Sequence, residues 1–129
     1  MSGNRIPAAV ALWPIDGGPL LQGVISSTAN PVVAVAGLPG VIIRVYQIMF
    51  VVSSTTNITF QDGVTALSGS MAMLANGSVE WELNGWPWFT TSAGNAFQIG
   101  NALGAQVSGT IYYTLTPPSI PGAVPYDAL

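Results

Sequence analysis

The sequence predicts an all-β protein: a two-sheet antiparallel sandwich, jelly-roll-like, with an extended arm at each end. Strand-like segments recur through residues 21–116, turn residues separate them at short intervals, and no stretch has the spacing of a confident helix. The strand count favours a jelly roll over an immunoglobulin-like domain, and the strand order stays open. We expect an N-terminal arm over residues 1–20, the sandwich over 21–116, and a proline-rich C-terminal arm over 117–129.

The first twenty residues are predicted to be extended because Pro7, Pro14 and Pro19 leave no room for a helix of useful length. Apolar residues such as Trp13 nevertheless need cover. Two interpretations stay open: an irregular lid on the chain's own sheet, or an arm that grips a neighbouring subunit.

Short runs of apolar and β-branched residues, each bounded by Gly, Pro, Asn or Asp, define the strands. The predicted strands are residues 21–26, 32–36, 41–53, 57–61, 78–84, 95–102 and 105–116. The turns at 27–31 and 37–40 close the first two. The third is the longest, and its density of Val and Ile on both faces predicts partial burial on both sides.

The later strands follow from alternation and turn signals. Asp62-Gly63 ends the strand at 57–61, and residues 64–74 are consistent with a short strand, a bulge or a loop. Residues 78–84 form the clearest half-buried strand, in which Val79, Trp81 and Leu83 alternate with two glutamates. The last two strands likewise place apolar residues on one face.

The stretch 84–94 concentrates Trp86, Trp88 and Phe89 around a proline. Each of these side chains could remove roughly 150–250 Å² from water, so either the core or a partner must cover them. We expect a buried corner between two strands at or near a subunit interface, with ligand contact as the alternative.

Charge is scarce: 5% of residues are charged, where about 25% is usual. Charged surface residues of both signs normally keep monomers from associating, and this chain has few of them. The low charge therefore indicates a subunit whose surface is mostly covered by neighbouring subunits. The net charge of −3 argues against nucleic acid as a partner. The most apolar run, residues 41–52, is interrupted by Arg44 and is too short to span a membrane.

Arg44 lies inside a predicted strand, where an unpaired guanidinium would be costly, so we expect an ion pair or an interface contact. The candidate interface residues are Arg5, Trp13, Arg44, Trp86, Trp88, Phe89, Pro117, Pro118 and Tyr126.

The residues that carry catalysis are scarce too. Without His or Cys there is no Ser-His triad, thiol nucleophile or thiolate metal site. Glu80 and Glu82 project from one face of a strand about 6.6–6.8 Å apart, a spacing that a glycosidase could use. Their alternation with apolar residues explains them as a solvated face instead. We expect no enzyme, no cofactor and no metal, and we interpret Asp16 and Asp62, each before a glycine, as turn residues.

Several segments together resemble small structural proteins of tailed-phage virions, in particular capsid cement or decoration proteins. The segments that carry the resemblance are residues 60–69, Met71, 75–78, 86–91, Gly94, Ala96 and 105–109. It implies a jelly-roll-like subunit that trimerises on the outer surface of the head shell and bridges neighbouring capsomers, with the major capsid protein as its partner. It implies no catalytic residues.

A second function from a different class stays open. A receptor-binding or carbohydrate-binding sandwich of a phage fibre or tail would use Trp86 and Trp88 as stacking platforms, with Asn84 and Asn95 beside them. That function predicts exposed indoles, whereas the decoration function predicts indoles buried in the core or between subunits.

Overall fold

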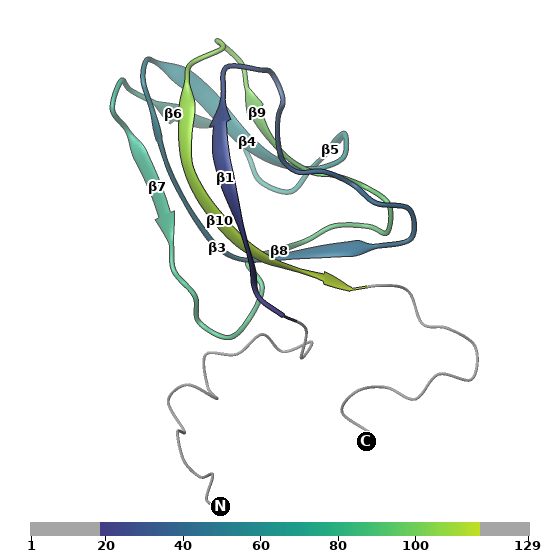
Figure 1. Ribbon diagram of the computed structural model, residues 1–129. Coiled ribbons are helices and arrows are strands. Elements are labelled where there is room, and N and C mark those ends of the chain that lie inside the picture. The colour runs from purple at the N-terminus through teal and green to yellow at the C-terminus, as the bar shows by residue number, and fades with distance from the viewer. Residues whose placement is uncertain (1–18, 117–129) are drawn as a thin grey trace, which may run out of the picture.

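The protein is a sandwich of two antiparallel β-sheets (Figure 1). The computed structural model describes residues 19–116, and every structural statement below refers to them. The strands are β1 (Leu21–Ser27), β2 (Val32–Val35), β3 (Ile42–Val52), β4 (Thr56–Asp62), β5 (Thr65–Ala66), β6 (Met71–Met73), β7 (Ser78–Trp81), β8 (Phe89–Thr90), β9 (Phe97–Asn101) and β10 (Val107–Thr116). Across this range no helix is long and apolar enough to cross a membrane.

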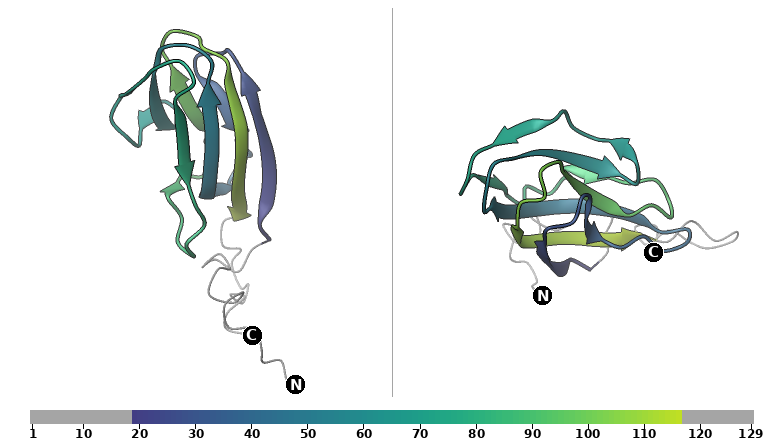
Figure 2. Two further views of the ribbon diagram at one scale, coloured as in Figure 1. Left: turned by 90° about the vertical axis from the view of Figure 1, so that its left-hand side faces the viewer. Right: turned by 90° about the horizontal axis from the view of Figure 1, so that it is seen from above.

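Each sheet has four strand positions. The first sheet has the order β1-β10-β3-β7, with β8 following β7 along the same edge of β3. The second has the order β2-β9-β4-β5, with β6 on the same edge of β4 as β5. Figure 2 shows the two layers from the side and from above. Because β10 returns between β1 and β3, and β9 between β2 and β4, the chain has the two Greek keys of a jelly roll. The predicted two-sheet, jelly-roll-like fold is confirmed.

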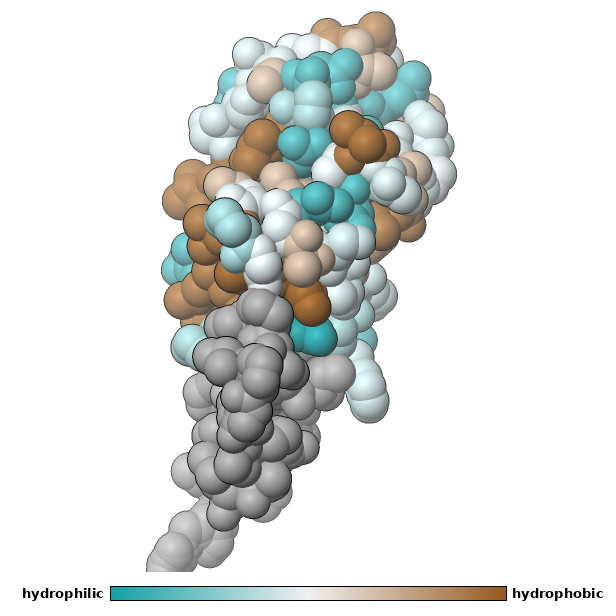
Figure 3. All heavy atoms as spheres, turned by 90° about the vertical axis from the view of Figure 1, so that its right-hand side faces the viewer, coloured by the Kyte–Doolittle hydropathy of each residue, from teal (hydrophilic) through white to brown (hydrophobic). Residues whose placement is uncertain are grey.

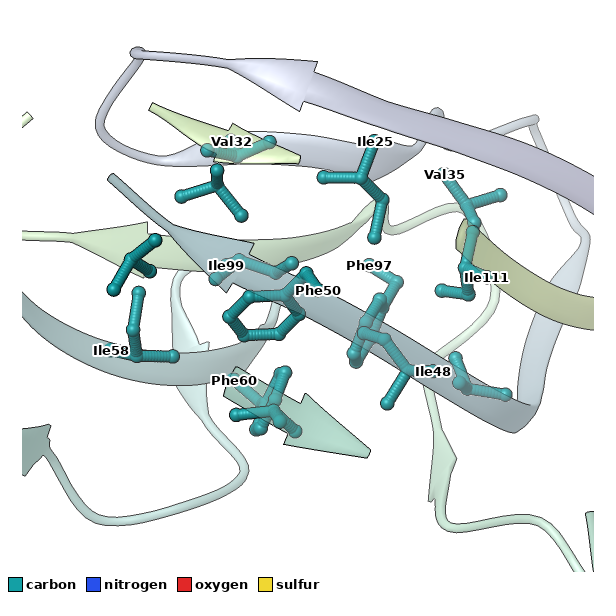
Figure 4. Packing of buried hydrophobic residues seen from close by; sticks show 14 of the residues in the cluster. Ile25, Val32, Val35, Ile48, Phe50, Ile58, Phe60, Phe97, Ile99 and Ile111 are labelled. Atoms are coloured by element: carbon teal, nitrogen blue, oxygen red, sulfur yellow. The ribbon is translucent and has the colours of Figure 1, made fainter. Parts of the chain in front are cut away.

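The core lies between the layers and draws on both sheets (Figure 4). Its buried members are Ile25, Val32, Val35, Ile43, Val45, Ile48, Phe50, Val52, Ile58, Phe60, Val79, Phe97, Ile99, Ala105, Val107 and Ile111. Burying one large apolar side chain of this kind contributes about 1.5–3 kcal/mol. The sandwich therefore has a continuous core, and a sequence without cysteine gives it no disulfides.

The strands agree with the sequence prediction except at one side of the sandwich. The strand expected over residues 78–84 ends at Trp81, and β8 was not predicted. The ambiguous stretch 64–74 contains two short strands, β5 and β6, separated by a loop. In that loop the Ser68 hydroxyl accepts a hydrogen bond from the Phe60 amide at 3.0 Å, in place of a backbone carbonyl. Both edge positions on this side are thus interrupted.

A β-bulge bends β3 near its middle. Tyr112 pairs with Gln47 and Tyr113 with Val45, so Tyr46 is one extra residue opposite β10. Val45 and Tyr46 are consecutive and both buried, which accounts for the lack of a polar face in this part of the sequence. Simple alternation therefore fails within the longest strand.

Asn101 anchors the loops at one end of the sandwich. Its side-chain oxygen accepts hydrogen bonds from the Thr56 hydroxyl at 2.8 Å and the Ala105 amide at 3.1 Å. Its side-chain nitrogen donates to the carbonyls of Ala29 at 3.2 Å and Ala105 at 2.7 Å. Asn101 and Thr56 are completely buried, and the four bonds offset the cost of burying an amide.

Candidate functional site

The two ends of the described chain and the aromatic stretch meet in one row across the first sheet. Leu21 pairs with Tyr113, Tyr113 with Val45, and Val45 with Phe89. Because neighbouring strands lie about 4.8 Å apart, this row spans roughly 14 Å. Figures 1 and 2 place the loop between β7 and β8 at the end of the sandwich where β1 begins and β10 ends. We call this loop, residues 82–88, the aromatic loop.

Hydrogen bonds within the aromatic loop fix its shape. The Asn84 side-chain oxygen accepts from the Trp86 amide at 2.9 Å, and the Trp88 indole N–H donates to the Glu82 carbonyl at 2.9 Å. Gly85 between them has φ 92°, a conformation that side chains rarely adopt. The hydrogen bond from the Trp88 indole thus joins the two ends of the loop, and Gly85 allows the backbone to turn between them.

Aromatic rings connect the loop to the core. The Trp88 ring lies 5.4 Å from that of Trp81, which in turn lies 5.1 Å from the ring of Phe60. Phe89 lies 4.8 Å from Phe60 and is half-buried, packed against the core. The loop therefore rests on a rigid base, since ring pairs at such distances attract by about 0.5–1.5 kcal/mol each.

The two indoles of the loop are nevertheless open to solvent. Trp86 is 66% exposed and Trp88 42% exposed. The chain's own core therefore does not bury these two indoles, which excludes one of the two forms that the expected buried role could take. The reason is local: β7 stops at Trp81, and the chain leaves the sheet edge before returning as β8. Burial by a neighbouring copy stays a prediction.

The corner between the sheets lies after the aromatic residues rather than among them. The Asp62 carboxylate accepts hydrogen bonds from the Ser92 amide and hydroxyl, each at 2.9 Å, and from the Asn95 side-chain nitrogen at 3.0 Å. These bonds join the end of β4 to the segment that crosses from β8 to β9. Asp62 was interpreted only as a turn residue, and its role at the crossover depends on partners about thirty residues away, which sequence spacing does not reveal.

Arg44 is half-buried on β3 in the row next to the one that contains Phe89. Its guanidinium Nη1 donates to the Thr116 hydroxyl at 2.7 Å, and it pairs with Thr114 on one side and Thr90 on the other. Arg44 thus lies at the same end of the sandwich as the aromatic loop. Its expected role at a subunit interface stays a prediction.

A scan against protein-family models finds no match, and searches of curated proteins and of solved structures also find none. The resemblance to virion proteins therefore stays a prediction that rests on the motifs themselves.

Four of the nine predicted interface residues lie near one another. Trp86, Trp88 and Phe89 are close together in and beside the aromatic loop, and Arg44 lies at the same end of the sandwich. The other five, Arg5, Trp13, Pro117, Pro118 and Tyr126, lie outside the described residues, as do nearly all of the N-terminal arm and the whole C-terminal arm.

The described residues contain no group of three or more His, Cys, Asp or Glu side chains that could hold a metal ion. Glu80 and Glu82 are both exposed, as their interpretation as a solvated face predicts. A shallow hollow of about 200 Å³ on the second sheet has only uncharged polar groups and small residues in its lining. Its lining residues are Asn30, Asn57, Thr59, Gln61, Ser70, Gly100, Asn101 and Ala102.

Proposed function

We propose that this protein is a structural subunit of a virion. In this proposal it forms a homotrimer on the outer surface of a capsid and stabilises the shell by bridging capsomers, with the major capsid protein as its second partner. The supporting observation is that one end of the jelly roll carries the exposed aromatic loop together with both ends of the described chain.

The composition of the surface supports this proposal. Trp is enriched in protein interfaces and among the residues that contribute most to binding energy, and charged residues are depleted at interface centres. The face in Figure 3 shows brown hydrophobic patches between white and teal polar residues. Exposed apolar residues such as Val24 at 79% and Met49 at 38% lie on the outer face of the first sheet. A subunit covered by neighbours needs few charges.

The proposal assigns no catalysis, cofactor, nucleic acid or membrane to this chain. Its arms would connect neighbouring subunits, because extended segments that become ordered on docking can cover large areas. Deleting residues 117–129 is expected to leave a folded oligomer that binds the particle more weakly. Sedimentation of the truncated and full-length proteins with undecorated particles measures this difference, and equal binding would show that the segment does not attach the protein.

The decisive experiment is the copy number in purified particles. Quantitative mass spectrometry should give close to one copy for each copy of the most abundant particle protein. A handful of copies per particle would contradict the decoration function and favour a part of a fibre or tail.

One observation favours the carbohydrate-binding alternative. Trp88 is 42% exposed while its ring is held against Trp81, and a fixed, solvent-facing indole is a suitable platform for a sugar ring. A glycan array on the purified protein tests this alternative. Saturable binding that is lost in Trp88→Ala, while the circular dichroism spectrum is unchanged, would contradict the decoration function.

A further inference from the structure

Two features of this chain have matching chemistry: the exposed indoles of the aromatic loop and the proline-rich segment 117–129. We propose that residues 117–129 of one copy bind across Trp86 and Trp88 of a neighbouring copy. This inference rests on the self-association proposed above and names the segment that occupies the aromatic loop.

The aromatic loop has the properties of a preformed platform. One side of the Trp88 ring packs near Trp81 at 5.4 Å, and its N–H is bonded to the Glu82 carbonyl, so its orientation is fixed before a partner arrives. Trp86, two residues away and 66% exposed, supplies the second ring. A surface that is already ordered loses little conformational entropy on binding.

The segment 117–129 suits such a platform. Four of its thirteen residues are proline, and Asp127 is its single charged residue. Proline-rich segments favour polyproline II, which repeats every three residues, so Pro118 and Pro121 would lie on one edge about 9 Å apart. Aromatic-lined surfaces recognise this conformation by packing proline rings on aromatic rings. Two proline rings on one edge are thus available for the two exposed indoles, and no charge complementarity is needed.

The direction of β10 favours a neighbouring copy over the same chain. β10 runs from the position opposite Val52 to the position opposite Ile42. The aromatic loop leaves the sheet between residues that pair with Ile48 and Val45, which lie behind the end of β10. The chain's own segment would have to reverse to reach the loop. A segment passed from each copy to the next can instead close a ring of three.

Disulfide trapping between separate chains tests this inference, because the natural chain has no cysteine. The full-length Glu82→Cys protein is mixed with the full-length Ser119→Cys protein under oxidising conditions, and mass spectrometry quantifies the 82–119 linkage. The matched control replaces Glu82→Cys with Leu103→Cys. Leu103 is 67% exposed and lies in the turn between β9 and β10, at the end of the sandwich that Asn101 anchors.

We expect about tenfold more 82–119 than 103–119 linkage, because docking raises the local concentration of one cysteine near the other. Adding Trp86→Ala to the Glu82→Cys chain should reduce the 82–119 yield about tenfold, as should adding Pro118→Ser and Pro121→Ser to the other chain. Equal yields at positions 82 and 103, or a yield that is insensitive to Trp86, would overturn the inference. A single chain that carries both Glu82→Cys and Ser119→Cys tests docking within one chain. Linkage that forms in this chain but not between separate chains would also overturn the inference.

Light scattering on the same samples separates this inference from the proposed function. A trimer that gives no preferential 82–119 linkage overturns the docking of the segment and leaves the decoration function standing. A monomer contradicts the proposed function as well.

Discussion

At the scale of single residues, burial distinguishes the aromatic side chains of the core from those of the aromatic loop. Phe60 is completely buried and contacts the rings of Phe50, Trp81, Phe89 and Phe97, whereas Trp86 extends into solvent. Of the aromatic residues in the stretch 84–94, Phe89 packs against the core. Trp86 and Trp88 remain exposed and are available for binding.

Truncation of these aromatic residues should reveal a gradient of stability. Phe60→Ala is expected to cost about 3–5 kcal/mol because it leaves a cavity in the core. Trp88→Ala should cost about 1–3 kcal/mol, since both its ring contact with Trp81 and its hydrogen bond to the Glu82 carbonyl are lost. Trp86→Ala should stay within about 0.5 kcal/mol of the natural protein. Urea denaturation of a non-associating sample measures all three, and equal costs for the two tryptophans would contradict the exposures described above.

Gly109 is a glycine whose surroundings leave no room for a side chain. A Cβ atom there would lie 1.9 Å from the Met49 carbonyl oxygen and 2.5 Å from the Phe50 Cα. Because both contacts are to backbone, β3 and β10 would have to separate. We expect Gly109→Ala to destabilise the fold by about 3 kcal/mol or more.

The matched control for this change is Gly69→Ala. No atom lies within 4 Å of a Cβ built at Gly69, which is exposed in the loop between β5 and β6. Its melting temperature should stay close to that of the natural protein. If the Gly109→Ala and Gly69→Ala proteins have the same melting temperature, β3 and β10 do not approach each other as closely as described.

At the scale of elements, the crossover from β8 to β9 depends on one carboxylate. Asp62→Asn keeps the size of the side chain but replaces one acceptor oxygen with a donor, so it can no longer satisfy Ser92 and Asn95 together. We expect a loss of about 1–3 kcal/mol. Hydrogen exchange should show faster exchange at the Ser92 amide, whereas the control Glu80→Gln, on the exposed side of β7, should change neither quantity.

The sequence was sufficient to predict strands in which apolar residues alternate regularly, and insufficient where a strand is interrupted. β4 and β10 lie within a residue or two of their predicted bounds. β8 was not found because its two residues are held by pairing with Arg44 and Val45, about forty-five positions away. The bulge at Tyr46 was hidden for the same reason, since its extra residue is defined only by the partner strand.

At the scale of the whole molecule, strand order was the part of the fold that the sequence left open. β1 pairs with β10 although Leu21 and Tyr113 are more than ninety residues apart, and no local pattern encodes such a contact. The candidate site likewise has one part that the sequence reveals and one part that only the fold reveals. Composition identified Trp86, Trp88 and Phe89, but their proximity to both ends of the described residues follows from three cross-strand pairings.

The scarcity of charge makes a prediction about self-association. With two basic and five acidic residues in the chain, the proposed trimer would depend mainly on apolar contacts. Its mass by light scattering should therefore be constant from about 0.05 to about 1 M NaCl, although the Debye length falls to about 3 Å at the upper limit. Dissociation at high salt would show that ionic contacts hold the subunits together.

The interrupted edge strands have a consequence for solubility. Natural sheets often discourage unwanted strand pairing with charged side chains, which this chain can hardly supply. On one side of the sandwich, β7 and β8 are separated by the aromatic loop, and β5 and β6 by the Ser68 loop. Neither edge offers an incoming strand a long, uninterrupted row of hydrogen-bonding groups. On this side of the sandwich, the shape of the backbone rather than electrostatic repulsion would thus hinder crowded copies from pairing edge to edge.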